Sequence, residues 1–99
     1  PNLSLFPELG LVSTYCNAGS AGLENALHLY RWDGARLLVV RYAVSASTDS
    51  GTILLRVFEA DYADGEREDR LLFEQEYAAN DAEALLTKEN ELLWDGIGE

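Results

Sequence analysis

The stretch "ALHLYRWDGARLLVVRYAV", residues 26–44, decides the fold that we expect for this chain. Asp33-Gly34 is a dipeptide that tolerates positive φ, and runs rich in aliphatic and aromatic residues flank it on both sides. This pattern is typical of two antiparallel strands joined by a tight turn. We therefore expect a β-hairpin with strands at 26–32 and 36–44.

The length of the turn decides which side chains face each other across this hairpin. A two-residue turn sets Arg31 opposite Arg36, and like charges in that position are unfavourable. A bulged three-residue turn sets Tyr30 opposite Arg36 instead and offers a cation–π contact, so we expect the bulged form. Two faces follow from the alternation of side chains: His28, Tyr30 and Trp32 on one, and Leu27, Leu29 and Arg31 on the other.

The segments after this hairpin continue the antiparallel pattern. "SASTDSGT" (45–52) indicates a loop, "ILLRVFEA" (53–60) a third strand, and the charged "DYADGERED" (61–69) a second loop around another Asp-Gly. "RLLFEQEYA" (70–78) indicates a further strand. Its two faces are Phe73, Gln75 and Tyr77 on one side, and Leu72, Glu74 and Glu76 on the other. One solvated face predicts a strand at an edge of the sheet.

The segment "NDAEALLTKENELLW" (80–94) has a different period. Asn80 or Asp81 is a suitable helix cap, Glu83 falls in the first turn, and four leucines recur at helical spacing: Leu85, Leu86, Leu92 and Leu93. We expect a helix at about 81–94 that closes against the sheet. Two short strands that turn at 88–90 are the alternative.

The first 25 residues carry weaker signals. "LSLFPELGLVSTY" (3–15) is an extended or looped segment with breaks at Pro7 and Gly10, and a strand is favoured from Val12 to Tyr15. "CNAGSAGLEN" (16–25) indicates a loop. We therefore expect one compact domain over residues 1–99, trimmed from a longer precursor and mainly β. Its sheet is an antiparallel meander of four to five strands, and the fold is α+β if the C-terminal segment is helical.

The charge of the chain limits its partners. Eighteen acidic residues against seven basic ones give a formal charge of −11, which repels nucleic acids and anionic lipid surfaces. The apolar runs are far shorter than the roughly 18 residues that a membrane-spanning helix needs. We expect no nucleic acid or membrane partner, and the same charge favours encounter with a basic protein.

The residues that usually carry out catalysis are scarce. Cys16 is the only cysteine, so no intrachain disulfide forms, and we expect it to be a small buried side chain. His28 is the only histidine, in mid-strand, and no serine lies in a Gly-x-Ser-x-Gly elbow. Lys88 is the only lysine, and no phosphate-binding loop surrounds it. Two facing acids in a cleft would be needed for glycosidase chemistry. We expect neither enzyme activity nor a cofactor.

One acidic cluster has the oxygen ligands that calcium prefers. Its members surround Gly65: Asp61, Asp64, Glu66 and Asp69. The fit to a calcium-binding helical loop is poor, because Ala60 and Tyr62 fall where acidic ligands are expected. An ordinary acidic hairpin loop explains the cluster, and we expect no metal.

What remains is contact surface. Tyr, Trp and Arg are over-represented among the residues that dominate binding interfaces. The expected partner-binding residues lie at or near the two Asp-Gly turns: Tyr30, Trp32, Asp33 and Arg36 in one group, and Asp61, Tyr62 and Asp64 in the other. The alternative for Tyr30 and Trp32 is that their rings cover one end of the core.

The segment "LHLYRWDGARLLVVR" (27–41) resembles the hairpin of aromatics, Asp-Gly and aliphatics that recurs in bacterial periplasmic immunity proteins similar to lysozyme inhibitors. The resemblance covers roughly residues 26–44. It implies a β-rich protein that binds a cell-wall hydrolase or a secreted toxin, and a periplasmic or secreted location.

Two hypotheses follow. The first is a binding protein of immunity or inhibitor type that occludes a cationic secreted toxin or cell-wall hydrolase, as a monomer or weak homodimer. The second is a structural or adaptor domain of a larger protein, which self-associates through the exposed edge of the strand at 70–78.

Overall fold

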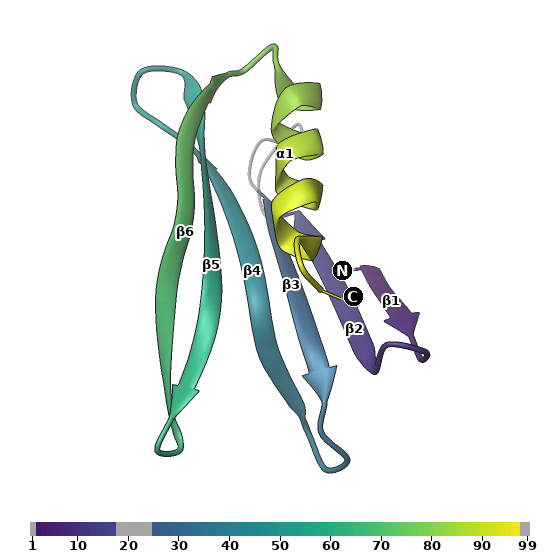
Figure 1. Ribbon diagram of the computed structural model, residues 1–99. Coiled ribbons are helices and arrows are strands. Elements are labelled where there is room, and N and C mark those ends of the chain that lie inside the picture. Colours follow the sequence, from purple (N-terminus) through teal and green to yellow (C-terminus); the bar gives the residue numbers. More distant parts are fainter. Residues whose placement is uncertain (1, 18–24, 98–99) are drawn as a thin grey trace.

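The computed structural model describes residues 2–17 and 25–97, with side chains from Leu3 to Tyr15 and from Asn25 onward. The described residues form one antiparallel sheet of six strands and one helix (Figure 1). The strands are β1 (Asn2–Phe6), β2 (Leu11–Asn17), β3 (Asn25–Trp32), β4 (Leu37–Ser47), β5 (Thr52–Ala63) and β6 (Glu66–Ala78), and the helix is α1 (Ala82–Trp94). Strand order in the sheet follows the sequence, so the expected meander is confirmed.

The sheet has more strands, and longer ones, than the four to five expected. Asn2–Phe6 forms a strand because Pro7 and Gly10 make a turn that brings it back onto β2, with the amide of Gly10 donating to the carbonyl of Pro7 (3.2 Å). The expected loop at 45–52 shrinks to a turn, because β4 continues to Ser47 and β5 begins at Thr52. Most of the expected loop at 61–69 is strand as well. The charged residues suggested a loop there, but residues 61–63 and 66–69 are extended and pair with each other.

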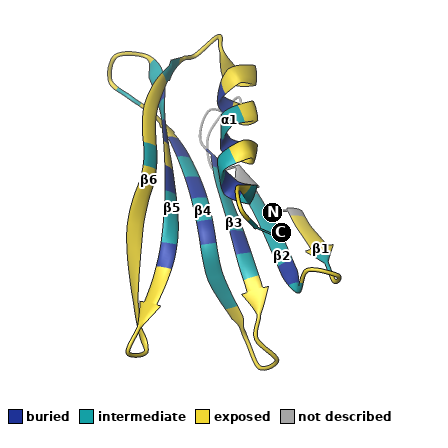
Figure 2. Ribbon diagram, in the orientation of Figure 1, coloured by how far each residue is buried: buried dark blue, intermediate teal, exposed yellow. Residues whose placement is uncertain are grey.

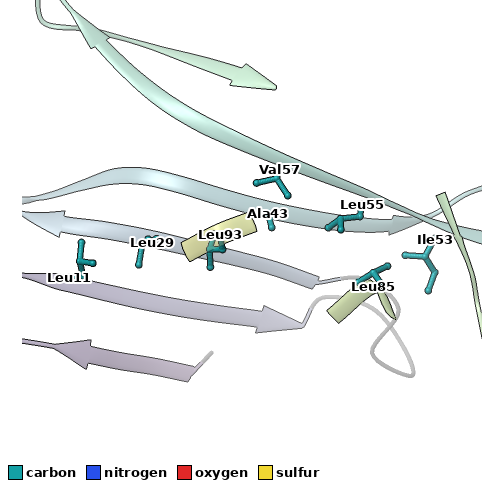
Figure 3. Close-up of a cluster of buried hydrophobic side chains, with 8 residues drawn as sticks. All are labelled: Leu11, Leu29, Ala43, Ile53, Leu55, Val57, Leu85 and Leu93. Atoms are coloured by element: carbon teal, nitrogen blue, oxygen red, sulfur yellow. The ribbon is translucent and has the colours of Figure 1, made fainter. Parts of the chain in front are cut away.

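The helix expected at 81–94 is confirmed at 82–94, and the two-strand alternative is wrong. Its start differs in one detail, because the side chain of Asp81 makes no capping hydrogen bond. The helix lies across one face of the sheet (Figure 1). Its buried leucines join side chains of β2 to β5 in a single core cluster (Figure 3): Leu11, Leu29, Ala43, Ile53, Leu55, Val57, Leu85 and Leu93.

Arg41 fastens the end of the helix to the sheet. Its Nη1 donates to the main-chain oxygens of Leu92 (2.9 Å) and Asp95 (2.7 Å). Carbonyls at the C-terminal end of a helix have no amide of a following turn to bind, so Arg41 supplies the missing donor. Its Nη2 lies 2.6 Å from a carboxylate oxygen of Glu59, and this hydrogen bond holds the pKa of Glu59 below its ordinary value. Arg41 is buried, and this pairing is what makes its position in the core tolerable.

The opposite face of the sheet has no helix over it (Figure 1). We call this surface the open face, and cross-strand pairing places Leu5, Tyr30, Tyr42, Phe58 and Leu71 on it. Figure 2 shows that burial is concentrated under α1 and that the hairpin ends of β3 to β6 are exposed. No described helix is long and apolar enough to span a membrane.

Candidate functional site

The meander gathers both groups of expected partner-binding residues at one end of the sheet. In an up-and-down sheet every second turn lies at the same end, so the turns β1–β2, β3–β4 and β5–β6 lie together (Figure 1). We call residues 30–40 of the β3–β4 hairpin the first finger and residues 60–71 of the β5–β6 hairpin the second finger. Tyr30, Trp32, Asp33 and Arg36 lie on the first finger, and Asp61, Tyr62 and Asp64 lie on the second.

Asp33 builds the tip of the first finger. One carboxylate oxygen accepts hydrogen bonds from the amides of Ala35 (2.9 Å) and Arg36 (2.8 Å), and the amide of Asp33 donates to the carbonyl of Arg36 (3.1 Å). The hydrogen bonds from the main-chain amides of Arg36 and Ala35 lower the pKa of Asp33. Asp33 is thus engaged in the turn. Arg36 extends into solvent with 76% of its side chain exposed and contacts Asp33 only at 3.9 Å.

The register expected for this hairpin is wrong in both of its forms. Trp32 pairs with Leu37 and Tyr30 pairs with Val39, so Tyr30 does not face Arg36 and no cation–π contact joins them. The reason is the turn, which spans Asp33 to Arg36 and takes Arg36 out of the strand. A bulge is present, but it falls between Leu29 and Tyr30, where β4 contains one extra residue.

Trp32 faces away from the helix-covered core. Its side chain belongs to the open face, like Tyr30, and the residue is 53% exposed. Beside it is a shallow hollow of about 300 Å³. The hollow is lined by Leu5, Pro7, Gly10, Leu11, Val12 and Trp32. The alternative that the Trp32 ring closes the core is therefore wrong.

The two fingers separate toward their tips. The last described pair between β4 and β5 is Arg41 with Glu59, and no further ladder pairing follows it among the described residues. The Tyr62 hydroxyl bridges the gap by donating to the carbonyl of Val39 (2.8 Å). A second hollow, of about 230 Å³, opens there between Arg31, Leu38, Val39, Val40, Ala60 and Tyr62.

The acidic residues of the second finger lie along its two strands and in the turn between them. Its turn consists of Asp64 (φ 54°) and Gly65 (φ 81°), both in the left-handed region. Asp61 accepts a hydrogen bond from Arg70 at 3.2 Å, and Asp69 binds Arg67 through both oxygens (2.7 and 3.0 Å). No group of three metal-binding side chains occurs in residues 2–17 and 25–97.

Charge is divided unevenly over the sheet. The part that builds β1 to β4 (residues 2–17 and 25–48) contains two acidic residues and three arginines. The part that builds β5, β6 and α1 (residues 49–97) contains fourteen acidic residues against four basic ones. Nearly all of the net negative charge therefore lies on the side of the second finger and the helix.

An aromatic row that the sequence did not reveal crosses the open face from β3 to β5. His28 stacks on Tyr30 (centroids 5.9 Å apart) and on Tyr42 (5.2 Å), and Tyr42 stacks on Phe58 (5.0 Å). Burial lowers the pKa of His28, and the nearby Arg67 lowers it further. His28 lies in mid-strand, as expected, and is half-buried in β3. Its neighbours could not be predicted, because they depend on cross-strand register.

The end of this row is held by charged groups. Tyr42 donates a hydrogen bond to Asp69, and the Arg67 guanidinium lies 5.6 Å from the centre of the Tyr42 ring. Arg67 lowers the pKa of Asp69, and the hydrogen bond from Tyr42 adds to that effect. These polar groups satisfy each other. The arrangement offers an ordered contact surface on the open face.

The side chain of Cys16 and most of the expected loop at 16–25 lie outside the described residues. Comparison with family models, with curated proteins and with solved structures finds no match for this chain.

Proposed function

We propose that this chain is a non-catalytic binding protein of immunity or inhibitor type, which holds a cationic secreted toxin or cell-wall hydrolase against its two fingers. The observation that carries the proposal is the exposed Trp32 at the tip of the first finger, next to an apolar hollow and across from the acidic second finger. An aromatic anchor beside charges of one sign is a common arrangement in tight interfaces.

The two fingers have different roles in this proposal. The first supplies contact area through Trp32, Leu37 and Arg36, all of them exposed. The second supplies the attractive field, because acidic groups outnumber basic ones along it. The hollow between the fingers accepts an apolar side chain of the partner. The periplasmic or secreted location belongs to the same proposal, because such hydrolases and toxins act there.

The electrostatic part is tested by association kinetics with a panel of cationic cell-wall hydrolases that includes a lysozyme, at low and high salt. We expect the association rate to fall as salt rises. The variant Asp64→Asn/Glu66→Gln should slow association, whereas Asp49→Asn/Glu91→Gln removes the same charge away from the fingers and should slow it less. If neither salt nor either variant changes the association rate, the electrostatic part of the proposal is wrong.

The contact part is tested with Trp32→Ala. Because the ring is half-exposed, the substitution should change the free energy of unfolding by less than about 1 kcal/mol, yet weaken binding by tenfold or more. Leu86→Ala, at an exposed leucine on α1, is the matched control and should leave binding unchanged. If no cationic hydrolase of the panel binds more tightly than a neutral protein does, the proposal is wrong.

A further inference from the structure

The two edges of the sheet differ in their protection against pairing. The edge strand β6 carries seven charged residues among its thirteen, and charge is a common device against edge-to-edge association. The edge strand β1 carries none, with the sequence NLSLF. The second hypothesis drawn from the sequence was self-association through the strand at 70–78. The charge on that edge opposes such pairing, whereas the edge of β1 has no charge to oppose it.

Two of the exposed side chains of β1 are large and apolar. Leu3 is 63% and Leu5 64% exposed, and both belong to the open face through pairing with Thr14 and Val12 of β2. The strand itself is held firmly. Phe6, on the opposite face, packs edge-on against Trp94 at 4.9 Å. The two leucines are thus presented in a fixed position beside the outer backbone of the strand.

Charge determines which partner suits this edge. The strands nearest β1 carry almost no net charge, while the acidic groups lie toward the other edge and on α1. A basic protein has little to attract it at β1. Two copies of the chain that meet there keep their acidic halves on opposite sides of the assembly, which minimises the repulsion between two molecules of charge −11.

We propose that β1 is a self-association surface, through which two copies of this chain pair antiparallel about a two-fold axis at Ser4. This register sets Leu3 of one copy opposite Leu5 of the other, twice, on the open face. Five paired residues bury less than the roughly 1,000 Å² typical of stable complexes, so the dimer is weak and concentration-dependent. Both pairs of fingers stay free, because they lie at opposite ends of the joined sheet.

Self-association does not depend on the proposed binding of a hydrolase, and salt separates the two. Binding of a cationic partner weakens as salt rises, because its attraction is screened. Pairing of two acidic copies strengthens as salt rises, because their repulsion is screened. Failure of either claim therefore leaves the other standing.

Sedimentation velocity tests the proposal from about 5 µM to about 1 mM protein, at low and high salt. We expect the average mass to rise from the 11.0 kDa of the monomer toward twice that value, more steeply at high salt. Leu3→Lys/Leu5→Lys should remain monomeric, although the added lysines reduce the net negative charge. Leu71→Lys/Leu72→Lys places the same substitution on the exposed leucines of β6 and should behave like the wild type.

Disulfide trapping tests the register. In a Cys16→Ser background, Ser4→Cys places two cysteines opposite each other at the two-fold axis, so mild oxidation should give a covalent dimer. Ser50→Cys, at an exposed turn at the other end of the sheet, should not. A chain that stays monomeric at every concentration overturns the proposal, as does a dimer that survives Leu3→Lys/Leu5→Lys or is lost in Leu71→Lys/Leu72→Lys.

Discussion

Glu89 lies in the middle of α1 with its side chain completely buried against the sheet. The helical turns on either side contribute Leu85 and Leu93 to the core, and neither carboxylate oxygen of Glu89 has a hydrogen-bond partner among the described residues. Arg41, which binds main-chain oxygens at the end of the same helix, is paired with Glu59. Burial raises the pKa of Glu89 from 4.5 to about 7, because a charged carboxylate loses its hydration there.

This shift links folding to pH with a definite sign. Between pH 4.5 and pH 7 the folded protein retains a proton that the unfolded chain has released, so the free energy of unfolding falls as pH rises through this window. Above pH 7 the contribution stays lost. A difference of 2.5 pH units corresponds to about 3 kcal/mol, a large share of the stability of a small domain.

Glu89→Gln removes the titration and nearly preserves the shape of the side chain. The variant should match the wild type within about 1 kcal/mol at pH 5 and exceed its free energy of unfolding by about 3 kcal/mol at pH 8. Urea unfolding followed by tryptophan fluorescence and circular dichroism at pH 5, 6, 7 and 8 measures this difference. Other titrating groups are common to both proteins and cancel.

Glu91→Gln is the control, because Glu91 lies on the same helix but is exposed. At pH 8 it should stay within about 1 kcal/mol of the wild type, because an exposed ion pair contributes little to stability. The reasoning is refuted if the difference between Glu89→Gln and the wild type stays constant from pH 5 to pH 8. It is equally refuted if the wild type gains stability relative to that variant as pH rises.

Three further predictions concern single residues. Arg41→Met should lower the free energy of unfolding by about 2–4 kcal/mol in urea titrations, because it leaves the helix end and Glu59 without their partner. The control is Arg56→Met, which breaks the exposed pair with Glu74 and should cost less than about 1 kcal/mol. Gly65→Ala should cost about 1 kcal/mol in thermal unfolding, because the residue has a φ of 81°. The imidazole signals of His28, the only histidine, should titrate by NMR with a midpoint below 6.5.

The local pattern of the sequence was sufficient for most of the elements. The Asp-Gly dipeptides predicted two hairpin turns, and helical spacing of leucines predicted α1 within one residue of its observed start. Alternation placed Phe73 and Tyr77 together, and both pack against the core cluster. These features depend on neighbours a few residues apart, which is why a single sequence contains them.

Features that depend on register and on packing were decided only in three dimensions. The four-residue turn after Trp32 and the bulge before Tyr30 determined which strand positions face each other, so the row from His28 to Phe58 had no signal in the sequence. Charge in residues 61–69 suggested a loop, although strand pairing extends through it. The sequence by itself thus determined a meander, its turns and its acidity. Only the tertiary structure decided how far the two fingers extend and that Glu89 is buried, because the length of each strand and the position of the helix over the sheet determine both.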